Sequence, residues 1–203
     1  MGEDAVVAVV PGRSCAGCTM CCKLLSIGEL NKPQQQWCTH CDIGVGCKIH
    51  ANKPTECSAF FCQYLLRADL EEDWKPSKCR MVLSYESGPK RIVIHVDEGR
   101  KDAWKREPYY SQIKRWAQMA VVNQGQVIVW QGLDAIAVLP HRDINLGRVR
   151  QDQLIMTSEK HTHAGVEMNV LVVDRDDPRL AGMQQPTEES PSVEIKVQRR
   201  RKE

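Results

Sequence analysis

The stretch RMVLSYESGPKRIVIHV, residues 80–96, decides the fold of this chain. It contains two runs rich in β-branched residues, 80–86 and 91–96, separated by Ser87-Gly88-Pro89-Lys90. Runs of this kind predict strands, and a short connection with glycine and proline predicts a hairpin. The central part of the chain therefore begins with two antiparallel strands.

The residues after this hairpin predict one amphipathic helix and two more hairpins. Apolar residues recur at helical spacing over 108–121, with Pro108 suited to the first turn and Gly125 to the stop. The further strand pairs are 126–130 with 135–139, and 154–160 with 166–173. Six strands and one main helix imply an α+β fold, an antiparallel sheet covered on one face.

The N-terminal third has a different composition, because all ten cysteines precede residue 80. With few large apolar residues, this part is too poor in core to fold unaided, and a metal would supply the missing stability. We therefore predict an irregular, metal-stabilised cysteine-rich module before the α+β domain. The predicted divisions are an N-terminal segment at 1–12, the cysteine module at 13–76, the α+β domain at 77–176 and a disordered tail at 177–203.

Charge and hydropathy exclude several classes of partner. With 28 basic and 26 acidic side chains, the chain lacks the broad basic surface that nucleic acid needs. The apolar run at 5–10 is too short for a secretory signal, and no segment has the length of a membrane span. We expect a cytoplasmic protein, in which reduced thiols serve as metal ligands; the even number of cysteines leaves a disulfide framework as the alternative.

The cysteine spacing predicts a metal site. A two-residue gap turns both thiolates of a pair inward, as in tetrahedral zinc and iron–sulfur sites. Ten thiols exceed the four that one such centre needs, so either two centres form or some cysteines are not ligands. The adjacent Cys21 and Cys22 cannot ligate one ion without strain, so at least one of them serves a second centre or packing. The predicted ligands are Cys15, Cys18, Cys21, Cys22, Cys38, Cys41, Cys47, Cys57 and Cys62.

The identity of the metal follows less directly from the spacing. The run Cys15-x2-Cys18-x2-Cys21 is similar to bacterial ferredoxin ligation and favours an iron–sulfur cluster. The pair Cys38-x2-Cys41, with later cysteines, suits zinc. Ligation by Cys79, His40 or His50 is left open. A surface metal site at His161 and His163 is a weaker alternative to a solvated turn.

The segment CAGCTMCC, followed by WCTHCDIGVGCKIHANKPTECSAFFC, resembles the YkgJ-type cysteine-cluster family, a zinc- or iron-chelating CxxCxxCC domain. The match covers residues 13–65 and departs from the family pattern at His50, where tyrosine is usual, and at Lys53, where arginine is usual. The resemblance implies a bound iron–sulfur cluster or zinc on the cysteines of this segment. It also relates the chain to flagellin lysine N-methylases.

Three functions are compatible with these observations. The favoured one is a metal-binding protein with a redox role for its cysteine cluster. The second is a cluster-dependent enzyme related to the lysine N-methylases, for which no catalytic residue outside the cysteines is identified. The third is a zinc-stabilised module that binds a protein partner.

Overall fold

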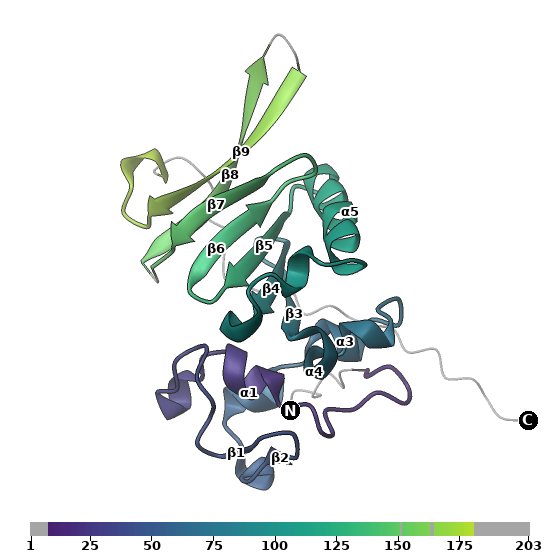
Figure 1. Cartoon of the computed structure of the whole chain (residues 1–203). Helices are drawn as coiled ribbons and strands as arrows, with labels where there is room; N and C mark the ends of the chain where they lie inside the picture. Colours follow the sequence, from purple (N-terminus) through teal and green to yellow (C-terminus); the bar gives the residue numbers. More distant parts are fainter. Residues whose placement is uncertain (1–7, 151, 163–164, 181–203) are drawn as a thin grey trace, which may run out of the picture.

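The computed structural model describes residues 8–150, 152–162 and 165–180. Figure 1 shows a central sheet with one long helix on it, the cysteine-rich module below and a projecting hairpin above. The α+β class predicted from the sequence is confirmed. The sheet contains, in spatial order, β3 (Met81–Glu86), β4 (Arg91–Val96), β5 (Gln126–Gln131), β6 (Asp134–Val138) and β7 (Asp143–Arg148).

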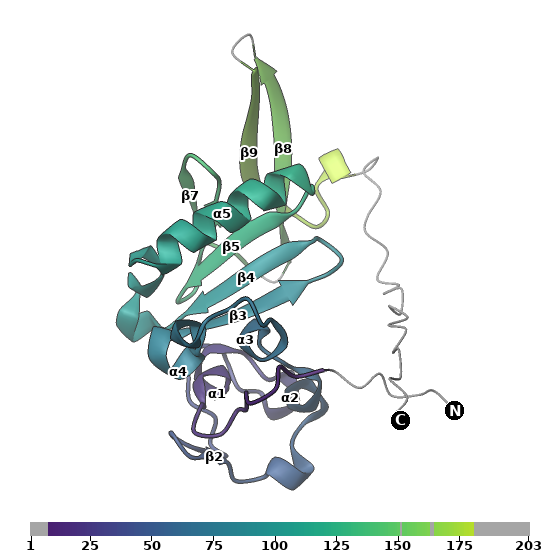
Figure 2. The ribbon, with the colours of Figure 1, turned by 90° about the vertical axis from the view of Figure 1, so that its right-hand side faces the viewer.

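The sheet is mixed rather than wholly antiparallel. The predicted hairpins β3–β4 and β5–β6 both form, but β4 and β5 run parallel, with Ile94 opposite Val129. Helix α5 (Tyr109–Val122) connects these two strands and crosses one face of the sheet (Figure 2). A connection through a helix is what parallel neighbours require, because a tight turn joins only antiparallel ones.

Gly125 lies where the chain returns from α5 to the sheet. Its ideal Cβ would lie 2.4 Å from the backbone oxygen of Lys90, so only Gly125 lets the chain pass the start of β4. The helix ends just before it, as the sequence predicts.

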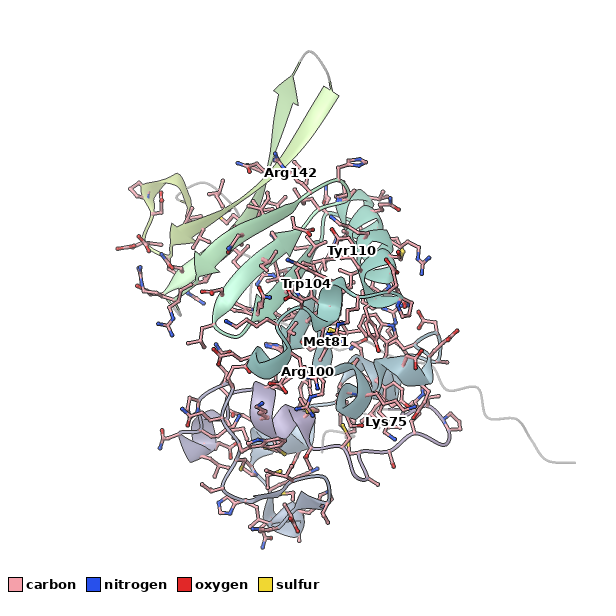
Figure 3. The ribbon with its side chains drawn as sticks, in the orientation of Figure 1. Lys75, Met81, Arg100, Trp104, Tyr110 and Arg142 are labelled. Atoms are coloured by element: carbon pink, nitrogen blue, oxygen red, sulfur yellow. The ribbon has the colours of Figure 1, made fainter. Side chains whose placement is uncertain are left out.

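The main core lies between α5 and the sheet. Trp104 and Ile113 are fully buried there, together with Met81 and Ile94 from the strands. Figure 3 labels Trp104 and Met81. The same core continues toward the N-terminus, because Tyr64 and other residues before position 76 belong to it.

The third predicted hairpin forms outside this sheet. Strands β8 (Gln153–Thr162) and β9 (Gly165–Asp174) pair only with each other among the described strands. Their Ile155 and Val170 pack against Ile128 and Ala137, on the sheet face opposite α5. The sheet is therefore covered on both faces, where the sequence predicts cover on one.

The cysteine module has little regular structure, in agreement with the expected irregular module. Its helices are single turns, because the segments between cysteines are too short for more. The elements are α1 (Met20–Leu24), β1 (Cys41–Asp42), β2 (Gly46–Cys47), α2 (Thr55–Ala59), α3 (Gln63–Leu66) and α4 (Pro76–Cys79). The 3-10 turns within the described residues are Gly28–Leu30, His50–Asn52, Glu72–Trp74, Glu98–Arg100, Ala103–Lys105 and Pro178–Leu180.

Two kinds of contact join this module to the sheet. Met20 and Leu24 of α1 pack against Val82, which is fully buried on β3. The Asp97 carboxylate, at the end of β4, accepts hydrogen bonds from Lys23 Nζ and Arg80 Nη2, each at 2.6 Å. Because Lys23 follows the vicinal cysteines directly, α1 is fixed in position against the sheet.

No helix among the described residues has the length and apolar character needed to cross a membrane. Most of the predicted tail, 181–203, lies outside the described residues, as do residues 1–7 and His163. The side chain of His161 is likewise not described, so the alternative histidine site stays a prediction.

Candidate metal centre

A single cavity of about 1010 Å³ lies within the cysteine module. Residues from the N-terminal loop, α1, the β1–β2 hairpin and α2 surround it. All nine predicted ligands line it, namely Cys15, Cys18, Cys21, Cys22, Cys38, Cys41, Cys47, Cys57 and Cys62. His40, His50, Lys32 and Lys53 line it as well.

The first cysteines are held by a turn and an arginine. The Cys18 amide donates to the Cys15 carbonyl at 2.9 Å, and Gly17 between them has a φ of 68°, which glycine adopts without strain. The Arg13 guanidinium donates to the backbone oxygens of Tyr64, Arg67 and Leu70 and lies 4.3 Å from the centre of the Tyr64 ring. This residue ties the first cysteine loop to α3.

Helix α1 carries the vicinal pair. Met20 and Leu24, four positions apart, face the sheet, while Cys21 and Cys22 between them are partly exposed. Successive residues of an α-helix are rotated by about 100° around its axis, so the two thiols leave the helix in different directions.

The second cysteine pair forms a turn docked on this helix. The Cys38 amide donates to the Cys22 carbonyl at 3.0 Å, and the Cys41 amide donates to the Cys38 carbonyl at the same distance. Cys41 then pairs with Cys47 across the β1–β2 hairpin. The Gly44 amide donates to the Thr19 hydroxyl at 3.1 Å, which fixes the hairpin against the start of α1.

The last two cysteines come from α2 and from the start of α3. Helix α2 is anchored by a reciprocal pair, in which Glu56 Oε2 accepts from the Gly28 amide at 2.7 Å and the Glu56 amide donates to Glu29 Oε1 at 2.8 Å. These bonds bring Cys57 back toward the 28–30 turn. Cys62 occupies the N-cap position of α3 and packs against the apolar cluster of Met20, Leu24 and Val82 as well as against the main core.

The surroundings of five cavity thiols favour their protonated form. Burial raises the pKa of Cys41 and that of Cys62 to about 11 each. A hydrogen bond with Cys21, together with burial, raises the pKa of Cys22 further. Burial also raises the pKa values of Cys15 and Cys57. Metal ligation needs thiolates, so binding would displace these protons.

Lys32 supplies a positive charge inside the cavity. It is only 8% exposed, and its Nζ donates to the backbone oxygens of Lys23, at 2.9 Å, and of Leu25. Burial lowers the pKa of Lys32, while the nearby thiols, Cys38 first among them, favour its charged form. The sequence gives no signal for this role, because an isolated lysine before a proline is ordinary.

Within the described residues, no three histidine, cysteine or acidic side chains converge closely enough to hold an ion as they lie. The donor set nevertheless fits a thiophilic metal, because nine thiols face one cavity beside a buried lysine. The cysteines present thus suit the iron–sulfur cluster or zinc that the sequence leads us to expect.

Cys79 lies apart from this cavity. Its thiol is 4% exposed in the main core and contacts the backbone oxygens of Trp74, at 3.5 Å, and Met81, at 3.4 Å. Burial raises the pKa of Cys79 to about 12. We interpret Cys79 as a packing residue, whereas His40 and His50 remain within the cavity wall.

Comparison with known proteins identifies no relative. No family model matches the chain, and no curated protein or solved structure matches it either. The resemblance to the cysteine-cluster family therefore remains an expectation drawn from the motif.

Proposed function

We propose that this protein is a metal-binding protein that carries an iron–sulfur cluster or zinc on thiolates of its N-terminal module. The observation that supports the proposal is the shared cavity, into which separate loops bring all nine predicted ligands. Packing alone does not account for this arrangement, because seven of the nine thiols are only partly buried or exposed, whereas a cysteine that only fills a core is buried as Cys79 is. The proposal places the protein in the cytoplasm, where thiols stay reduced.

The electrostatics of the cavity support the same function. Four thiolates around a divalent ion carry a net negative charge, and a buried cation offsets part of it. Lys32 is fixed in place by two backbone oxygens and is within electrostatic range of Cys22, Cys38 and Cys57. An iron–sulfur cluster would supply one-electron transfer at this position, whereas zinc would supply structural stability.

The test is the metal content of the full chain purified without oxygen. We expect stoichiometric metal per chain, measured as iron, acid-labile sulfide and zinc, together with a visible absorption spectrum. Broad absorption with iron and sulfide identifies a cluster, and a colourless protein with zinc identifies zinc. The matched control is Cys79→Ala, which should retain the full metal content because Cys79 lies outside the cavity. Protein that is folded but free of iron and zinc would refute the proposal.

A further inference from the structure

The packing around them divides seven of the nine thiols into two groups. Cys18, Cys21 and Cys62 lie against the apolar cluster of Met20, Leu24 and Val82, on the side of the cavity next to the sheet. A second apolar cluster is centred on Ile27, and its cysteines are Cys22, Cys38, Cys41 and Cys57. The vicinal pair is therefore split, with one thiol in each group.

The electrostatic neighbours of the thiols give the same division. Cys62 is within electrostatic range of Cys15 and Cys18, which adds Cys15 to the first group. Cys57 is within range of Cys22, Cys38 and Cys47, which adds Cys47 to the second group.

The two groups of thiols interact with each other mainly through the adjacent residues Cys21 and Cys22. The Cys21 thiol has the largest influence on the pKa of Cys22, and the Cys41 thiol of the second group acts on it as well. An ionised Cys22 would also raise the pKa of Cys15, by less than an ionised Cys18 would.

Each group also has a lysine beside it. Lys53 favours the charged form of Cys15 in the first group. Lys32 interacts most strongly with Cys38 and Cys22 of the second group, then with Cys21 of the first and with Cys57. A cation beside each set of thiols offsets part of the negative charge that four thiolates would carry.

We propose that the module holds two separate metal centres, with the boundary between them passing through the vicinal pair. The ligands of the first are Cys15, Cys18, Cys21 and Cys62. The ligands of the second come from Cys22, Cys38, Cys41, Cys47 and Cys57. This inference rests on the proposed function and deepens it.

Both sets meet the requirement of a four-thiolate centre. The first has four thiols, three of them in the C-x2-C-x2-C run. The second has five, one more than a tetrahedral ion needs, and includes the turn of Cys38 and Cys41. When a zinc ion takes four protonated thiols, four Zn–S bonds form and four protons pass to solvent. The cavity, with about 1010 Å³, is much larger than the roughly 30 Å³ that one water occupies in the liquid.

The experiment combines serine substitutions within and between the groups, and measures metal per chain on the whole protein. Cys21→Ser should lose about half of the wild-type metal, and so should Cys38→Ser/Cys41→Ser, which leaves the second group only three thiols. The pair Cys21→Ser/Cys62→Ser removes two ligands of one centre, so it should lose no more than Cys21→Ser alone. The triple variant Cys38→Ser/Cys41→Ser/Cys62→Ser leaves both groups with fewer than four thiols and should lose nearly all of the metal.

A single shared centre predicts a different pattern, in which every one of these variants loses the same fraction. That pattern would overturn the two-centre inference and leave the proposed function standing. A wild-type protein without metal would instead refute the proposed function.

A titration of the wild-type protein keeps the inference testable if the variants do not fold. Reduced, metal-free protein is titrated with Co²⁺, and the thiolate-to-cobalt absorption is followed. Saturation at two equivalents per chain supports two centres, and saturation at one overturns them.

Discussion

Replacing Asp97 by asparagine tests how the cysteine module is held on the sheet. The carboxylate is only 1% exposed and accepts from Lys23 Nζ and Arg80 Nη2, both at 2.6 Å, and from the Gly99 amide at 3.0 Å. Asparagine has nearly the same shape and can still accept from Gly99. What it removes is the negative charge between two cations.

The expected loss of stability follows from burial. Removing one partner of a buried ion pair costs about 3–5 kcal/mol, because the remaining charge is left uncompensated. The cations Lys23 and Arg80 are 19% and 39% exposed in their side chains, so water compensates them in part. We therefore expect Asp97→Asn to lower the free energy of unfolding by about 3 kcal/mol, at the lower end of that range.

The pH dependence has a definite sign. Burial opposes ionisation of Asp97, but the hydrogen bonds from Lys23, Gly99 and Arg80 outweigh it and hold the pKa of this carboxyl below its usual value. The native state therefore releases the proton more readily than the unfolded chain does. The stabilisation is complete above about pH 4, where the unfolded carboxyl is ionised, and is lost as the pH falls through the lower native pKa.

Urea unfolding, followed by tryptophan fluorescence at pH 7 and at decreasing pH, measures both effects. The matched control is Asp69→Asn, which removes the exposed ion pair with Arg67 and should change stability by less than about 0.5 kcal/mol. If Asp97→Asn were as stable as this control at pH 7, the inference that the buried Asp97 carboxylate holds the module on the sheet through Lys23 and Arg80 would be wrong.

Three further substitutions probe other parts of the structure. Burial lowers the pKa of His95 to about 4, so stability should fall as the pH drops from about 6.5 to 4, and pH-dependent urea unfolding of His95→Leu should lack this loss. Gly125→Ala places a Cβ against the Lys90 backbone and should cost at least about 1 kcal/mol in the same assay; an unchanged midpoint would contradict the close approach. Arg13→Met removes the guanidinium that holds the first cysteine loop and should weaken Co²⁺ binding in a competition titration with a chelator; unaltered affinity would exclude this positioning role.

The strands of the sheet could largely be predicted from the sequence, but which strand pairs with which could not. Strands β3 and β4 are continuous β-branched runs, which are a strong local signal. The parallel pairing of β4 with β5 depends on the path of α5, and a helix between two strands was the available hint. Strand β7 was missed because Ile144 and Leu146 are its only large apolar residues, beside Gly147.

The site shows the same division between local and long-range information. Cysteine spacing singled out the nine cysteines that line the cavity, since two-residue gaps are a local feature. The assignment of Cys21 and Cys22 to different groups depends on how α1 is oriented against Val82, which spacing does not contain. The role of Lys32 depends on a fold that brings its ammonium to the backbone of residues 23 and 25.

The position of β3 gives the cysteine module a protective role. This strand is at the end of the sheet order, so its outer backbone groups have no partner strand among the described residues. Helices α1, α3 and α4 pack against it instead. An uncovered edge of this kind is a template for pairing between chains, and so for aggregation. Under the proposed function, loss of metal that loosens the module would expose this edge together with Val82 and would lower the solubility of the protein.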